Sequence, residues 1–289
     1  MKVLIVGANG FIGQAMARHV KMVHPTADIV GVVRPDSRAV PDTPFRAVRQ
    51  IEQADLLIYL VGRGGIPESI TDPADAFQAN CQEAITALET ARTLGVSQFV
   101  LASTCALYPR GPHPAQEHGP LSLQTPYAKA KRTAELYGIT ASELTGQDVR
   151  VVRLANVYGP KQRRQLIYDV AMRALGGEKV ELQSSGTEKR DFVHVDDTAR
   201  AIWAVAENGK PGGIYNVGSG TPRSVRDAAK LICASFGAKL TLPEATKPDT
   251  TGSGDAYPDI TKLLKLGFEP QIDFETGLNE TLNWIRSTT

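Results

Sequence analysis

A tyrosine and a lysine one helical turn apart have the residue types and spacing for proton chemistry. Lys131 lies in a stretch of helical spacing over residues 128–144, and Tyr127 directly precedes that stretch. Their i to i+4 separation places them on one helix face. Free tyrosine, with a pKa of about 10, is a poor base at neutral pH, but a nearby ammonium stabilises its phenolate. The pair can therefore exchange a proton with a substrate hydroxyl or carbonyl. An ordinary surface pair has the same spacing, so the alternative stays open.

A hydroxyl group is expected near this pair. Residues 99–102 form an apolar run that ends in Ser103 and Thr104. In sheets of parallel strands, ligands bind at the carboxyl ends of the strands. Thr104 is therefore predicted to hydrogen-bond the reacting oxygen; alternatively, its hydroxyl only closes the strand or starts a turn.

A glycine-rich loop follows the first apolar run and leads directly into a segment of helical spacing. Glycines allow a tight turn and close approach to phosphate, and the free N–H groups of a helix start attract a pyrophosphate. This pattern predicts a dinucleotide site, although an ordinary glycine turn between strand and helix would look similar. The predicted cofactor-binding residues of the loop are Gly7, Asn9, Gly10, Phe11, Ile12 and Gly13.

The end of the second apolar run bears on the choice between NAD and NADP. An acidic residue there binds the ribose hydroxyls of NAD, whereas an arginine pairs with the 2′-phosphate of NADP. Arg34 favours NADP. In the alternative, Arg34 is an exposed arginine and Asp36 turns toward the ribose, so the predicted cofactor is NAD or NADP.

The elements that must position these residues alternate between two patterns. Continuous apolar runs suit parallel strands covered by helices on both faces, and stretches of helical spacing separate them. The apolar runs are residues 3–6, 29–33, 56–61, 99–102 and 149–154, and the helical stretches are 12–23, 79–94 and 128–144. We therefore expect an α/β fold, a Rossmann-type doubly wound parallel sheet.

The second half of the chain is broken into shorter pieces by glycines and prolines. We expect a dinucleotide-binding domain over residues 1–155, to which residues 191–217 return. Residues 156–190 and 218–289 would form a smaller, partly interleaved substrate-binding region.

Composition excludes several classes of protein. A formal charge of +1 over 289 residues implies no broad nucleic-acid-binding surface. The three cysteines form neither a disulfide framework nor a zinc motif. No apolar run reaches membrane-spanning length and no signal peptide is evident, so a cytoplasmic protein is expected.

Taken together, the motifs resemble the extended short-chain dehydrogenase/reductases, which include nucleotide-sugar epimerases, dehydratases and reductases. The resemblance runs from the first strand to about Gly220, in matching order and spacing. The matching segments are residues 7–13, Asn80, residues 94–96, 103–104, 107–108, 127–131, 153–160 and 190–197.

The resemblance implies a role for each matching residue. Thr104 would be the catalytic threonine, Tyr127 the acid/base, and Lys131 the residue that binds the nicotinamide ribose and tunes Tyr127, which also lies against the cofactor. Asn80 would help to order the cofactor. Asn156 and Arg190 would bind a nucleotide-diphosphate sugar, and a homodimer is expected by analogy.

Ordinary structural roles remain open for part of the later motifs. Asn156 before Gly159 and Pro160 also fits turn chemistry, and Asp196 or Asp197 before a helical stretch fits a helix cap.

Three departures from the resemblance bear on the reaction and on substrate binding. The 4,6-dehydratases carry an acidic pair after the catalytic threonine, where this chain has Cys105 and Ala106, so dehydration is not expected. GDP-fucose synthase uses a Cys and a His where this chain has Ala106 and Lys161, which disfavours a double epimerisation. Gly252 stands about where a second phosphate-binding arginine is expected, which weakens the diphosphate prediction.

The function predicted from the sequence is C4 epimerisation of a nucleotide sugar through a transient 4-keto sugar. An NADPH-dependent 4-keto-sugar reductase would use the same residues. A protein that senses a dinucleotide without catalysis is a third hypothesis, which an intact set of Thr104, Tyr127 and Lys131 disfavours.

Overall fold

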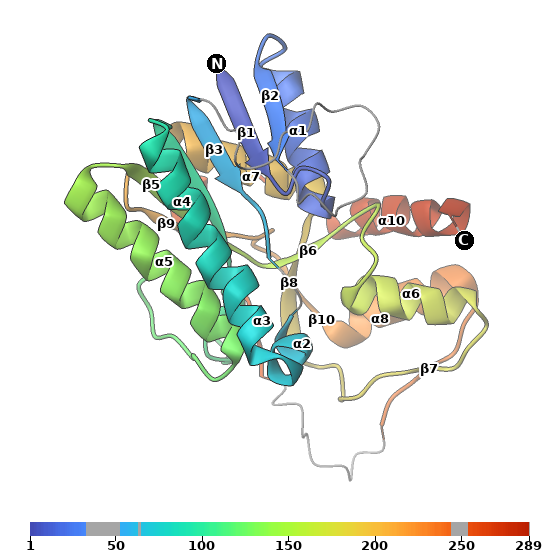
Figure 1. Ribbon diagram of the computed structural model, residues 1–289. Helices are drawn as coiled ribbons and strands as arrows, with labels where there is room; N and C mark the ends of the chain where they lie inside the picture. Colours follow the sequence, from blue (N-terminus) through green and yellow to red (C-terminus); the bar gives the residue numbers. More distant parts are fainter. Residues whose placement is uncertain (33–52, 63–64, 244–253, 289) are drawn as a thin grey trace.

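A six-stranded parallel sheet forms the centre of the structure, a computed structural model that describes residues 1–32, 53–62, 65–243 and 254–288 (Figure 1). The strand order is β2-β1-β3-β4-β5-β9. The strands are β1 (Lys2–Val6), β2 (Asp28–Val32), β3 (Leu56–Tyr59), β4 (Gln98–Thr104), β5 (Asp148–Leu154) and β9 (Ile214–Val217). Because apolar side chains fill both faces of the sheet, its strands read as continuous apolar runs. The predicted doubly wound α/β fold is confirmed.

Helices cover both faces of this sheet (Figure 1). On one face α1 (Phe11–Val23) packs against α7 (Val195–Asn208), and on the other lie α4 (Glu83–Thr93) and α5 (Pro126–Thr145). Thr125 caps the start of α5 by accepting a hydrogen bond from the Ala128 N–H, and Pro126 occupies the first turn. These local signals set α5 so that Tyr127 lies in its first turn.

The helix expected over residues 79–94 starts earlier and is interrupted. It consists of α2 (Ile66–Thr71), α3 (Pro73–Phe77), a π-helical turn η2 (Gln78–Gln82) and α4. Asn80 therefore lies inside the π-helical turn rather than opening the helix. Such turns occur often at functional sites, because the widened backbone re-aims a side chain.

A second, smaller body contains two short sheets and three helices. One sheet has the order β10-β8-β6 and the other pairs β11 with β7. Its helices α6, α8 and α10 share a separate apolar core. The bounds are β6 (Asn156–Tyr158), α6 (Gln165–Leu175), β7 (Val180–Glu181), β8 (Lys189–His194), β10 (Pro222–Ser224), α8 (Val225–Phe236), β11 (Leu240–Thr241) and α10 (Phe274–Thr288), while α9 (Thr261–Leu264) packs near β9.

The chain crosses between the two bodies more than once. It leaves the main sheet after β5, pairs β6 with β8 in the small sheet, and returns through α7 and β9. The return thus begins at α7, a few residues after the predicted position 191; the domain limits themselves stay a prediction. Among the described residues, no helix is long and apolar enough to cross a membrane.

Candidate active site

Tyr127 and Thr104 meet where β4 ends and α5 begins. The Thr104 hydroxyl lies within hydrogen-bonding reach of the Tyr127 phenol, and Thr104 Oγ1 accepts a hydrogen bond of 3.1 Å from the Ala106 N–H. Burial raises the pKa of Tyr127, while Thr104 and the charge of Arg164 act to lower it. The Thr104 hydroxyl can therefore donate a hydrogen bond to the same substrate oxygen that exchanges a proton with Tyr127.

Lys131 lies one turn beyond Tyr127 and is almost fully buried. Its ammonium donates to the carbonyl of Ala102 at 3.2 Å and to that of Val61 at 3.4 Å. Burial lowers its pKa to about 8, with the carboxylate of Glu135 acting in the opposite direction. A lysine with this pKa is still mostly charged at neutral pH and can stabilise a phenolate.

Asn80 is brought to the same place by the π-helical turn. A Cβ atom built on Gly62 would lie 3.0 Å from Asn80 Oδ1 and 3.1 Å from Lys131 Nζ. Asn80 is 1% exposed and donates its Nδ2 to the Ala76 carbonyl. The bare backbone at Gly62 thus leaves space beside an amide oxygen and an ammonium, which suits the hydroxyls of a ribose.

The glycine loop has the geometry of a pyrophosphate site. Gly7 has a φ of 91°, and a Cβ on Gly13 would lie 2.1 Å from the Gly7 carbonyl oxygen, so both positions require glycine. α1 begins immediately after Gly10, which has no side chain to cap the first N–H groups. Those donors face the loop formed by Gly7, Asn9, Gly10, Phe11, Ile12 and Gly13, so the residues present fit a dinucleotide.

Arg34, which favoured NADP, lies outside the described residues, and so does Asp36.

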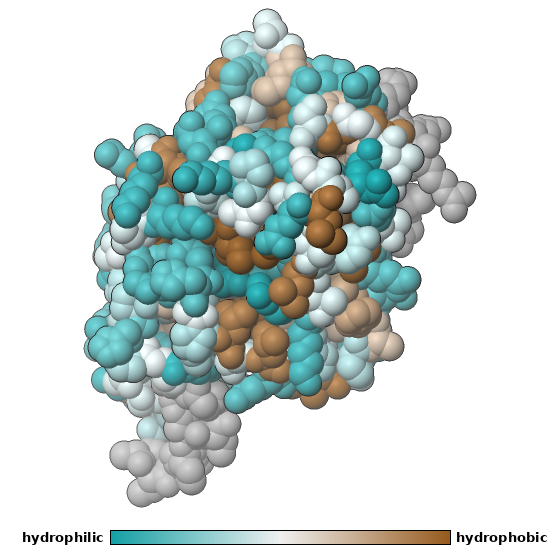
Figure 2. All heavy atoms as spheres, turned by 90° about the vertical axis from the view of Figure 1, so that its left-hand side faces the viewer, coloured by the Kyte–Doolittle hydropathy of each residue, from teal (hydrophilic) through white to brown (hydrophobic). Residues whose placement is uncertain are grey.

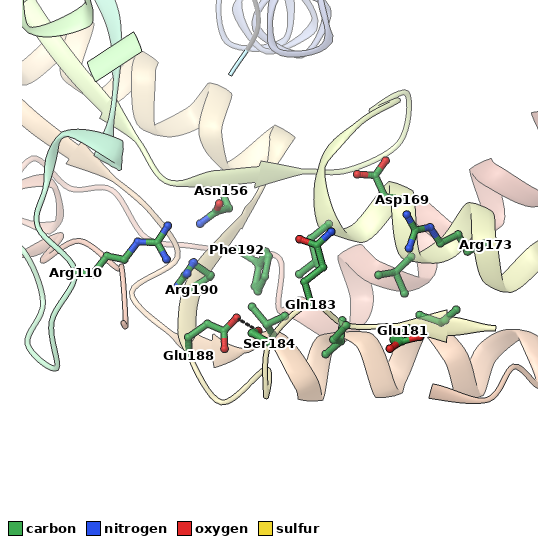
Figure 3. Close-up of a pocket in the computed structure, with 15 residues that line it drawn as sticks. Arg110, Asn156, Asp169, Arg173, Glu181, Gln183, Ser184, Glu188, Arg190 and Phe192 are labelled. Atoms are coloured by element: carbon green, nitrogen blue, oxygen red, sulfur yellow. Dashed lines mark hydrogen bonds between the residues drawn. The ribbon is translucent and has the colours of Figure 1, made fainter. Parts of the chain in front are cut away.

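A cavity of about 410 Å³ lies in the small body, and Arg110 of the loop after β4 lines it from outside that body (Figure 3). Ligand pockets commonly have volumes of about 300–1,000 Å³. Its polar lining includes Asn156 and Arg190, and its apolar lining comes from the small body: Leu166, Val170, Val180, Leu182, Phe192 and Val225. Asn156 and Arg190 at one end, beside this apolar surface, suit a nucleotide diphosphate, while Asp169, Arg173 and Glu181 line the opposite end.

Asn156 links this cavity to the proton-transfer residues. It follows Leu154 by two residues, and Leu154 is the register partner of Thr104 at the ends of β5 and β4. Its amide donates to the Asp191 carbonyl at 3.1 Å. Asn156 and Arg190, predicted to bind substrate, are thus brought together near the strand ends that carry Thr104.

The acidic residues after Arg190 have structural partners. Asp191 accepts hydrogen bonds from the backbone of Ser219 and Gly220, and Asp197 accepts from the N–H groups of Gln271 and Ile272. Asp196 pairs with Arg18. These carboxylates hold loops and helices together, and the α7 cap is the side chain of His194 rather than either aspartate.

Sequence reasoning missed three contributors to the site. Glu135 and Arg153 form a buried ion pair behind Lys131, and Arg110 lines the cavity beside Arg190. Glu135 could have been found, because it lies four residues after Lys131 and so shares its helix face. Arg110 has no such signal, since its loop is far from Arg190 in the sequence.

The positions after Thr104 carry no carboxylate. Cys105 Sγ donates to the Arg153 carbonyl at 3.2 Å, and burial raises the pKa of its thiol well above its usual value. Ala106 offers only its backbone N–H. Lys161, which stands where GDP-fucose synthase has a histidine, donates a hydrogen bond to Gln14 Oε1 at 2.8 Å.

Known proteins resemble this chain over most of its length. The model of the NAD dependent epimerase/dehydratase family matches residues 3–218. The chain is 30% identical to a dTDP-glucose 4,6-dehydratase of Streptomyces antibioticus over 99% of this chain and 92% of that protein. It is 33% identical to a UDP-glucuronate 4-epimerase of Thermodesulfobacterium geofontis over 84% and 77%.

A solved structure shows the same fold over its whole length. The UDP-glucose 4-epimerase of Thermus thermophilus in complex with NAD superposes with a TM-score of 0.89 at 26% identity, covering 100% of both chains. The family model spans most of this chain, and the predicted resemblance is confirmed. The chain belongs to the NAD-dependent epimerase/dehydratase family of extended short-chain dehydrogenase/reductases.

Proposed function

We propose that this protein is an NAD(P)-dependent C4 epimerase of a nucleotide-diphosphate sugar. The observation that carries the proposal is the placement of the Thr104 hydroxyl beside the Tyr127 phenol, with no carboxylate at Cys105 or Ala106. Such a site can move a proton on and off one sugar oxygen and has no side chain there for expelling a second hydroxyl.

Each residue has a definite task in this reaction. Tyr127 removes the proton from the sugar O4 hydroxyl and later returns it. Thr104 donates a hydrogen bond to the same oxygen, while Lys131 stabilises the phenolate through its charge. A nicotinamide cofactor held by the glycine loop, Asn80 and Lys131 would supply the hydride chemistry at C4. When the transient ketone presents its other face, the same three side chains complete the reaction in the opposite configuration.

Dehydration is the main rival, because several relatives are dehydratases. Loss of water from the neighbouring carbons requires an acid at the leaving hydroxyl and a base at the adjacent carbon. Cys105 binds a backbone carbonyl and its pKa is raised, so it stays a neutral thiol, and Ala106 cannot transfer a proton. These residues favour the epimerase relatives over the dehydratases.

The cofactor assignment rests on the glycine loop and on the groups beside Gly62. Gly7, Gly10 and Gly13 leave the start of α1 open to a pyrophosphate, and Asn80 with Lys131 can receive a ribose. The solved relative holds NAD. NAD is therefore the cofactor expected in a purified preparation, with NADP as the alternative that Arg34 favours.

A homodimer through α4 and α5 is a further part of the proposal. Figure 2 shows apolar side chains among hydrophilic ones on the face that these helices form. Leu136, Tyr137 and Leu144 of α5 are exposed there, with 80% exposure at Leu144. Sedimentation velocity should give a dimer for the wild type and a monomer for Leu136→Glu; a monomeric wild type would contradict this part.

The test of the function is a product assay on a panel of UDP- and dTDP-linked hexoses and hexuronic acids. An epimerase converts one of them to a mixture with its C4 epimer, without net change in the cofactor. Release of a 4-keto-6-deoxy sugar would instead identify a dehydratase. Net consumption of NADPH with a 4-keto sugar would identify a reductase, and absence of turnover with bound dinucleotide would favour a sensor.

A further inference from the structure

Two arginines from distant parts of the chain face one end of the cavity. Arg110 lies in the loop after β4, and Arg190 lies in β8 of the small body. Figure 3 shows the Arg110 guanidinium directed toward Arg190 and Asn156. Two guanidinium groups and an amide at one end of a cavity suit a ligand that carries two adjacent negative charges.

The segment that starts at Gly254 holds the two arginines side by side. Arg190 Nη1 donates to the Gly254 carbonyl at 2.9 Å, and the N–H of Gly111 donates to the Asp255 carbonyl at 2.8 Å. A Cβ on Gly254 would lie 2.9 Å from the Arg110 Cβ. Glycine at this position therefore lets the Arg110 loop approach the backbone that Arg190 binds.

The electrostatics of this end change when an anion binds. Burial lowers the pKa of Arg190, and the neighbouring positive charge of Arg110 lowers it further. Glu188 and Asp255 act in the opposite direction, but Glu188 already accepts a hydrogen bond from Ser184, and Asp255 accepts one from the Lys189 N–H. An entering diphosphate would relieve the repulsion between the two arginines.

The C-terminal part of the chain offers no second arginine for the diphosphate over a long stretch. No arginine occurs between Arg226 and Arg286, and Gly252 stands about where a second phosphate-binding arginine is expected. Arg110 lines the cavity at the end where Arg190 lies, whereas Arg173 lines the opposite end.

We propose that Arg110 is the second diphosphate-binding residue of this protein and acts with Arg190 as a two-arginine clamp. The inference rests on the proposed function, because it assigns a residue to the nucleotide-diphosphate part of that substrate. Arg110 binds the ligand and does not take part in proton transfer. Its loss therefore changes KM much more than kcat.

The experiment is calorimetric titration of UDP and dTDP into NAD-loaded protein, with uridine and thymidine as ligands that lack phosphate. Loading with NAD keeps these probes out of the dinucleotide site. The variants are Arg110→Gln, Arg110→Lys and Arg190→Gln, and Arg92→Gln is the control, because it removes one positive charge on the exposed surface of α4. Thermal melting confirms that each variant is folded.

We expect Arg110→Gln and Arg190→Gln each to weaken diphosphate binding by about 10- to 100-fold, since a hydrogen-bonded charge contributes on that scale. Arg110→Lys should recover part of the loss, and nucleoside binding should stay unchanged. Arg110→Gln binding within twofold of wild type, while Arg190→Gln loses affinity, would overturn the inference and leave the proposed function intact. A wild type that binds neither diphosphate would overturn the inference and, for UDP- and dTDP-linked sugars, the proposed function as well.

Discussion

Arg153 of β5 and Glu135 of α5 form a buried two-pronged ion pair directly behind the proton-transfer residues. Arg153 Nε and Nη2 donate to the two Glu135 carboxylate oxygens at 2.9 and 2.8 Å, and the two residues are 1% and 0% exposed. Arg153 Nη1 also donates to the Tyr108 hydroxyl, which donates to Asn216 Oδ1. This network fixes the helix face of Tyr127 and Lys131 against the ends of β4 and β5.

Breaking this pair on one side should destabilise the fold strongly. Glu135→Gln leaves the Arg153 charge buried without its counter-ion, which costs about 3–5 kcal/mol. Urea unfolding of the two proteins measures the difference. Arg132→Gln is the control: Arg132 bonds the same carboxylate from a position that is 21% exposed, and its loss should cost under about 1 kcal/mol. A loss for Glu135→Gln as small as the control's would contradict the network's role.

The same network predicts that a double substitution recovers stability. In Arg153→Met with Glu135→Leu neither charge of the pair remains buried, so the double variant should be more stable than either single variant. Its turnover should nevertheless fall, because α5 is no longer held by directed bonds. Additive losses in the double variant would show that the two residues do not act as a pair.

Lys131 should reduce the stability of the folded protein at neutral pH. Its pKa is about 8 in the folded state against 10.5 in the unfolded chain, so the unfolded chain holds the proton more tightly. The penalty for burying the ammonium is complete below pH 8, falls as the pH rises from 8 to 10.5, and is absent above that.

Urea unfolding at pH 7 should therefore give Lys131→Met a higher free energy of unfolding than wild type, by about 3 kcal/mol in the cofactor-free protein. The advantage should shrink toward pH 10. Lys129→Met, an exposed lysine on the same helix, should show no such trend. Turnover of Lys131→Met should be lost in spite of the added stability, and a pH-independent stability difference would contradict the buried-charge explanation.

Tyr127→Phe removes the acid/base and keeps the ring. Turnover should fall by about 100-fold or more, on the scale of general acid–base catalysis, while NAD binding measured by fluorescence changes little. Tyr137→Phe on the same helix is the matched control, because that hydroxyl binds only Glu89 in the described contacts. Retained turnover in Tyr127→Phe would exclude Tyr127 as the acid/base.

Gly13→Ala should disrupt the dinucleotide loop. The new Cβ would lie 2.1 Å from the Gly7 carbonyl oxygen and 2.7 Å from the Ala8 Cα, so the loop must move away from α1. NAD affinity should fall at least about tenfold, because the helix start no longer meets the pyrophosphate. Gly111→Ala, with nothing within 4 Å of its added Cβ, should bind NAD like wild type. Equal NAD affinities of Gly13→Ala and wild type would contradict the requirement for glycine at position 13.

The sequence predicted the parts of the fold and site that depend on local pattern. Continuous apolar runs indicated the parallel strands, and the glycines of residues 7–13 indicated the turn, because each depends on a short stretch of chain. The pairing of Tyr127 with Lys131 followed from helical spacing. Thr104 was placed by strand direction alone, since ligands gather where parallel strands end.

What the sequence could not predict depends on contacts between distant segments. Arg110 meets Arg190 only because both lie against the segment at Gly254, and Arg153 reaches Glu135 only once α5 lies on β5. Asn80 was expected at a helix start but lies in a π-helical turn, because the helix preceding it extends back to Ile66. Spacing along the chain does not encode these three-dimensional placements.

The most direct test of C4 epimerisation follows a deuterium atom placed at C4 of the nucleotide sugar that the product assay identifies. The enzyme is used as purified, without added cofactor, and both epimers are analysed by mass spectrometry and NMR. We expect deuterium to remain at C4 in both epimers, since the hydride leaves and returns within one site, and we expect Tyr127→Phe to stop the conversion. Loss of the label to water, or a product one water lighter, would contradict it.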